Sequence, residues 1–125
     1  MLPAKEKLWA MYLHLSHNMW EDKFPSLQFD EALWNDILTS MHMNKLNMVV
    51  LTLGDGIQYE SHPEISVKNA WTKDKLKKEL EKCRKLGIEV IPELNFSAGH
   101  DQWLGKYSRM ISTETYYSVC KNLIT

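Results

Sequence analysis

Polar and aromatic side chains gather at three places along the chain, each after an apolar segment. Carboxylates, amides and imidazoles can bind sugar hydroxyls, and indole or phenol rings can stack on the C–H faces of a pyranose. These residue types therefore favour carbohydrate recognition. The substrate-binding candidates are His17, Trp20, Asp55, Gln58, Glu93, Asn95, His100 and Trp103.

Other site chemistries fit the sequence less well. The segment LGDGIQ is not a GxGxxG fingerprint and does not directly open a helix, which disfavours nucleotide binding. His17, His62 and His100 show neither HxH nor HExxH spacing, so we expect no metal and no other cofactor. Cys83 and Cys120 lack metal-ligand spacing, and we interpret them as buried free thiols.

Each candidate also has an ordinary structural interpretation. Asp55 lies between glycines, where aspartate favours a turn. Glu93 could pair with a lysine, and Asn95 could hold its own loop together through side-chain hydrogen bonds. Trp34 and Trp71 fall on helical patterns and are interpreted as core residues rather than sugar platforms.

The bulk composition is that of one ordinary globular domain spanning residues 1–125. The chain is 44% hydrophobic and 25% charged. Its 15 basic side chains nearly cancel its 16 acidic ones, which disfavours a nucleic-acid or anionic membrane partner. We recognise neither a membrane-spanning run nor a signal peptide.

Hydrophobic periodicity predicts six elements that would position these side chains. Strands are expected over residues 8–16, 46–53 and 88–96, and helices over residues 29–44, 71–87 and 112–124. In the first strand the apolar side chains alternate with polar ones. The second is nearly continuously apolar, as expected for a strand covered on both faces. In the third, Pro92 predicts a bulge or kink because it lacks an N–H donor.

The helical segments carry apolar stripes and end signals. The stripes consist of Leu33, Ile37, Leu38 and Met41 in the first helix, Leu76, Leu80, Cys83 and Leu86 in the second, and Tyr116, Val119, Cys120 and Leu123 in the third. Thr72 is expected to cap the second helix and Gly87 to end it in a left-handed conformation. Glu79 lies among lysines and acids, and we assign it to a solvated face.

The order β-α-β-α-β-α with long crossovers predicts a parallel α/β sheet. Such an arrangement is either an open doubly wound sheet or part of a (β/α)8 barrel. In both, ligands bind beyond the carboxyl ends of the strands, so the three long polar loops would share one rim.

Two segments carry a resemblance to a known family. MNKLNMVVLTLGDGIQYESHPEI resembles the second strand of the retaining β-N-acetylhexosaminidase family of glycoside hydrolases, with its apolar strand and acidic turn. WTKDKLKKELEKCRKLGIEVIPELNFSAGH resembles the helix and third strand that follow, including the IPE motif and a final Gly-His. The resemblance implies a TIM (β/α)8 barrel, of which this chain would hold the first three units.

The chain also departs from that family's pattern. An arginine supplied by the family's first strand has no equivalent here. The family's acidic loop after the second strand is reduced to a segment that keeps Asp55 and Gln58, and its aspartate after the third strand is Asn95. The resemblance implies a substrate-assisted reaction. It also places the catalytic Asp-Glu pair after a fourth strand, outside this chain.

Three functions are consistent with the sequence. The chain could be the N-terminal part of a glycoside hydrolase, inactive alone, or a small self-contained α/β carbohydrate-binding or interaction module. It could also be an open-sheet enzyme that uses Asp55, Glu93 and His100. We expect carbohydrate as a partner, and either self-association or a missing C-terminal half of the barrel. The resemblance leaves the compartment open and is consistent with a secreted or periplasmic parent protein.

Overall fold

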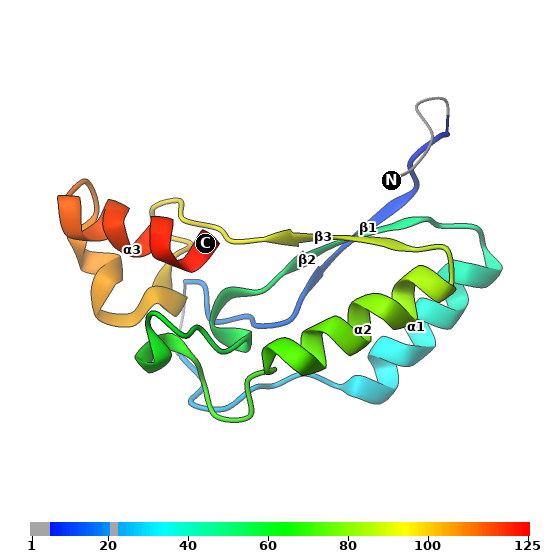
Figure 1. Cartoon of the computed structure of the whole chain (residues 1–125), viewed down its shortest axis with the longest axis horizontal. Helices are drawn as coiled ribbons and strands as arrows, with labels where there is room; N and C mark the ends of the chain where they lie inside the picture. Colours follow the sequence, from blue (N-terminus) through cyan, green and yellow to red (C-terminus); the bar gives the residue numbers. More distant parts are fainter. Residues whose placement is uncertain (1–5, 21–22) are drawn as a thin grey trace.

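The computed structural model describes residues 6–20 and 23–125. Three parallel strands form one sheet in the order β1-β2-β3, with helices between and after them (Figure 1). The strands are β1 (Ala10–His14), β2 (Met48–Thr52) and β3 (Glu89–Glu93), and the helices are α1 (Glu31–Met43), α2 (Lys73–Lys85) and α3 (Glu114–Ile124). The predicted parallel β-α-β-α-β-α order is confirmed.

One face of the sheet is covered by α1 and α2, which lie side by side along it (Figure 1). The alternation predicted for the first strand is confirmed, because Met11 and Leu13 pack into this helix-covered core and Leu15 is buried there. Trp34 and Trp71 are both buried in the same core, as expected. Burial of these side chains is the main force that holds the helices to the sheet.

The opposite face of the sheet carries no covering helix in the described part of the chain (Figure 1). Tyr12 is 51% exposed and Ile91 is 39% exposed on this open face, and Val50 is half-buried between them. The expectation that β2 is covered on both faces is therefore wrong for the residues described.

A second, smaller core lies beyond the carboxyl ends of the strands. There a 3₁₀ segment at Gln102–Met110 packs against α3, and it changes direction at Gly105, whose φ is 61°. The buried residues of this core are Tyr59, Ile65, Trp103, Leu104, Tyr116, Val119 and Leu123. The predicted inward stripe of α3 is confirmed for Tyr116, Val119 and Leu123, while Cys120 is half-buried.

The predicted end signals of α2 are also confirmed. The Thr72 side chain accepts a hydrogen bond from the backbone N–H of Lys75 at 3.1 Å. Gly87 follows the helix with a φ of 73°, a left-handed conformation that glycine adopts at low cost. Cys83 is buried in the main core as a free thiol, as predicted.

Two other predictions about the elements are wrong. Pro92 introduces no bulge, because β3 keeps an unbroken register with β2 from the Met48–Glu89 pair to the Thr52–Glu93 pair. Since β3 has no neighbour on its other side in the described chain, a residue without an N–H donor can be accommodated there.

The second wrong prediction concerns Glu79, which was assigned to a solvated face but is only 7% exposed. Its carboxylate accepts a hydrogen bond from Trp34 Nε1 at 2.8 Å and pairs with Lys75 at 2.9 Å and Lys82 at 2.5 Å. Burial acts to raise the pKa of Glu79, but the hydrogen bonds from Lys82, Lys75 and Trp34 outweigh it and hold the pKa below its usual range. This carboxylate joins α2 to α1. Within α1, Leu33 is 55% exposed, so Trp34 rather than Leu33 completes the inward stripe.

Candidate functional site

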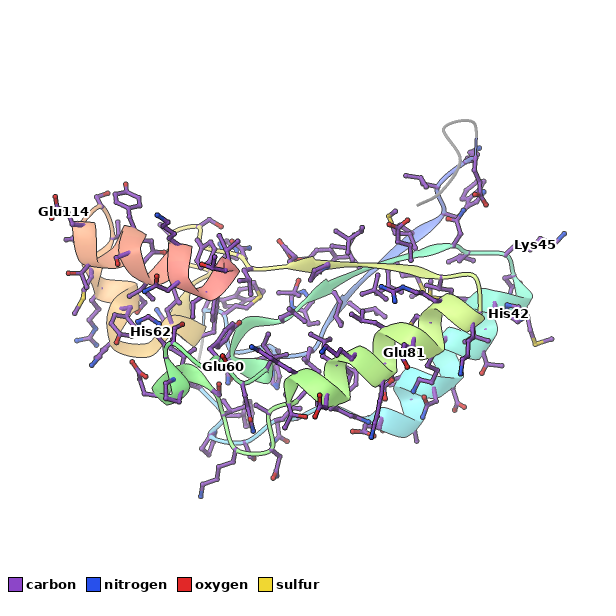
Figure 2. The ribbon with its side chains drawn as sticks, viewed as in Figure 1. His42, Lys45, Glu60, His62, Glu81 and Glu114 are labelled. Carbon is purple, nitrogen blue, oxygen red and sulfur yellow. The ribbon has the colours of Figure 1, made fainter. Side chains whose placement is uncertain are left out.

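The loops that follow the three strands meet at one end of the sheet, as the parallel order predicts (Figure 1). The loop after β1 is joined to the loop after β3 by a hydrogen bond from Gln102 N to Met19 O, at 3.0 Å. Figure 2 shows Glu60 and His62 on the loop after β2. His42 and Lys45 lie far from them, at and just after the C-terminal end of α1. We call the surface formed by these three loops the carboxyl rim.

Asp55 joins the first two loops from inside the protein. Its side chain is 0% exposed, and the carboxylate accepts hydrogen bonds from Ser16 Oγ and from Asn18 Nδ2, the latter at 3.0 Å. Lys23 Nζ lies 3.4 Å from the same carboxylate and is 36% exposed. Asn18 in turn bonds the backbone of Phe24 through both its amide oxygen and its amide nitrogen. In the described structure Asp55 is therefore a buried carboxylate that joins the loops after β1 and β2.

Trp103 lies in the second core rather than on the surface. It is 1% exposed, its ring stacks on Tyr59 at a centroid distance of 6.4 Å, and its N–H donates to Asn95 O at 2.9 Å. The ring is thus a packing element in the described structure and not the open platform that a loop position predicted. Burial, followed by the nearby Asp55 charge, raises the pKa of Tyr59 well above its usual range.

Glu93 ends β3 on the open face of the sheet, where it meets side chains from both other strands. Tyr12 donates a hydrogen bond to its Oε2 atom, and Thr52 Oγ1 contacts the same oxygen. Thr52 Oγ1 also lies 2.7 Å from the Tyr12 hydroxyl. Partial burial and the hydrogen bond to Glu93 together raise the pKa of Tyr12. We call these three residues the open-face cluster.

Trp20 and His100 form an exposed pair where the first and third loops meet. Their ring centroids are 5.3 Å apart with an edge-to-face angle of 76°, and Trp20 is 59% exposed. His17 is also exposed and packs against Phe24 at a centroid distance of 5.0 Å. Of the predicted candidates, Trp20 and His100 are therefore brought together by two different loops.

Gln58 lies apart from this pair, in a cleft of about 670 Å³ between the loop after β2 and the start of α2. Lys73 and Glu60 form an ion pair of 2.7 Å there, and this pairing lowers the pKa of Glu60. Asn95 accepts a hydrogen bond from the backbone N–H of Ser97 at 3.0 Å, so its side chain holds its own loop together.

Within residues 6–20 and 23–125, no three histidine, cysteine or acidic side chains are grouped so as to hold a metal ion. None of the helices in these ranges is long and apolar enough to cross a membrane.

Several residues of the rim were missed by the sequence analysis. Thr52 was not selected because it lies inside an apolar run, and Tyr12 was not selected because it lies within a predicted strand rather than in a loop. The network around Asp55 depends on Ser16 and Lys23, and their only signal in the sequence was proximity to the end of a predicted strand.

Comparison with known proteins identifies a structural relative but no family. No protein-family model and no curated protein matches the chain. Among solved structures, the chain is similar to the crystal structure of a beta-N-acetylhexosaminidase from Bacteroides fragilis NCTC 9343, with a TM-score of 0.67 and 15% sequence identity. The match covers 93% of this chain and 28% of that chain. The fold is thus a partial TIM-barrel-like unit, distantly similar to a glycoside hydrolase.

Proposed function

We propose that the chain contributes the first three strand–helix units, and part of the sugar-binding surface, to a glycoside-hydrolase-like barrel. The observation that carries the proposal is the exposed Trp20–His100 pair at the carboxyl rim. Ligand sites of (β/α)8 barrels lie at this end of the strands. The similarity to a hexosaminidase fold supports the same location.

The pair has the chemistry that a sugar requires. An exposed indole can stack on the C–H face of a pyranose, and the neighbouring imidazole can exchange hydrogen bonds with its hydroxyls. The backbone hydrogen bond between Gln102 and Met19 joins the two loops close to these rings. A site that is already in place before binding loses less conformational entropy when its ligand arrives.

Catalysis by this chain alone is disfavoured by the burial of Asp55. An open-sheet enzyme would need Asp55, Glu93 and His100 to act together on a substrate, yet Asp55 is 0% exposed and engaged by Ser16, Asn18 and Lys23. We therefore assign the chain a binding role and propose that a catalytic Asp-Glu pair is supplied from outside it. A self-contained carbohydrate-binding module would use the same surface.

The test is isothermal titration calorimetry, in which soluble oligosaccharides of N-acetylglucosamine, glucose, galactose and mannose are each titrated into the purified chain. Trp20→Ala should weaken binding of the preferred sugar at least about tenfold, which corresponds to ~1.4 kcal/mol. Trp9→Ala is the matched control, because Trp9 is 53% exposed and precedes β1 at the other end of the sheet.

Two results would contradict the proposal. One is that none of these oligosaccharides binds. The other is that the Trp9 and Trp20 variants weaken binding equally, because the carboxyl rim would then have no special role.

A further inference from the structure

The Glu93 carboxylate has no cationic partner in the described structure. Ion pairs within residues 6–20 and 23–125 engage Asp55, Glu60, Glu31 and Glu79, but not Glu93. Its Oε2 atom receives hydroxyl contacts from Tyr12 and Thr52, while Oε1 forms no hydrogen bond in those same ranges. This half-buried carboxylate is held only by hydroxyl groups, so its Oε1 atom can accept a further donor.

Tyr12 presents an aromatic ring beside this charge. It is 51% exposed on the open face, and its ring lies 5.1 Å from the His14 ring in an edge-to-face arrangement. A cation placed over an exposed phenol ring is attracted by the negative face of the ring quadrupole. Carboxylate and ring together make a site that distinguishes a positive group from a neutral one.

The position of the cluster is set by the backbone and not by flexible loops. Thr52 and Glu93 are register partners at the ends of β2 and β3. Tyr12 pairs with Val50, and its side chain reaches forward to the same oxygen. Three adjacent strands therefore bring these groups together near the carboxyl end of the sheet.

We propose that the open-face cluster binds the protonated amino group of an amino sugar, with the ammonium on Glu93 Oε1 and against the Tyr12 ring. This inference rests on the proposed function, because it specifies the sugar that the carboxyl rim receives. A neutral hydroxyl can donate to Glu93, but an ammonium also gains charge–charge attraction, and hydrogen bonds between charged partners are about twice as strong. An N-acetylated amine is neutral and bulkier at this position and loses that gain.

The test compares two β-1,4-linked oligosaccharides of equal length by calorimetry, one of glucosamine and one of N-acetylglucosamine. The wild-type chain should bind the glucosamine oligomer at least about tenfold more tightly. Glu93→Gln keeps an oxygen that can accept from Tyr12 and Thr52 but removes the charge, so the preference should fall to about twofold or less.

Glu89→Gln is the matched control. Glu89 lies four residues before Glu93 on the same face of β3, and it is half-buried as well. Both variants change the net charge equally, so general attraction between the chain and a cationic oligomer cancels in the comparison. Glu89→Gln should keep the tenfold preference.

The outcomes separate this inference from the proposed function. Equal loss of preference in both variants, or tighter binding of the N-acetylated oligomer by the wild-type chain, would overturn the amine assignment. If neutral sugars bind with dependence on Trp20 but no amine preference exists, only the amine assignment fails. If no oligosaccharide binds, both proposals fail. Should Glu93→Gln not fold, the wild-type comparison still decides the preference.

Discussion

Replacing Asp55 by alanine should lower the free energy of unfolding by about 3 kcal/mol before any ligand is present. The substitution removes the acceptor for two buried donors, Ser16 Oγ and Asn18 Nδ2. Each donor left without a partner costs about 1–2 kcal/mol. Lys23 adds less than about 1 kcal/mol, because it is 36% exposed and can turn to water.

The measurement is urea unfolding followed by circular dichroism, with thermal unfolding as a second readout. For a chain of this length, a loss of this size should lower the midpoint temperature by about 10 °C. Asp36→Ala is the control, because Asp36 is an exposed residue of α1 and its loss should change stability by less than about 0.5 kcal/mol.

Equal stabilities of the Asp55 and Asp36 variants would contradict this prediction. The buried hydrogen bonds to Asp55 would then contribute little to stability. A smaller effect of Lys23→Ala, below about 1 kcal/mol, would separate the ion pair from the two hydrogen bonds.

Three further changes test the packing and the helix ends by the same unfolding measurement. Glu79→Ala should lower the free energy of unfolding by about 2 kcal/mol, whereas Glu81→Ala, at an exposed position, should have no measurable effect. Because the pKa of Glu79 is lowered in the folded state, its stabilising contribution is present above the unfolded pKa and is lost as pH falls through the folded pKa. Glu79→Gln should therefore flatten the acid side of a stability–pH curve. Leu38→Ala should cost about 3 kcal/mol because Leu38 is 1% exposed, whereas Leu33→Ala should cost less than about 0.5 kcal/mol. Gly87→Ala should cost about 1 kcal/mol through backbone strain alone, since no atom lies within 4 Å of the added methyl group.

The order and type of the elements could be predicted because their signals are local. Alternation identified β1, and the Thr72 cap and Gly87 identified both ends of α2. Glu79 was assigned to solvent because it lies among charged neighbours. Its position one turn before the buried Cys83 was the stronger signal, since residues four apart share a helix face.

The candidate site was predicted less completely because it depends on contacts between loops. An aromatic residue after a strand can be a platform or a core residue, and the sequence does not distinguish Trp20 from Trp103. The difference arises from the second core, which forms only when the 3₁₀ segment at Gln102–Met110 packs on α3. Similarly, the contact between Tyr12 and Glu93 depends on the register of three strands, which no local pattern specifies.

The division of the hydrophobic interior into two cores has a kinetic consequence for the carboxyl rim. Ile57 and Leu94 pack against both cores, while most buried residues belong to one core or the other. Regions with separate interiors can open as separate cooperative units in native-state hydrogen exchange. Amides of the segment around Trp103 and of α3 should therefore exchange together and sooner than those of β2. The part of the rim contributed by the loop after β3 would then belong to a unit that can open while the sheet beneath it stays folded.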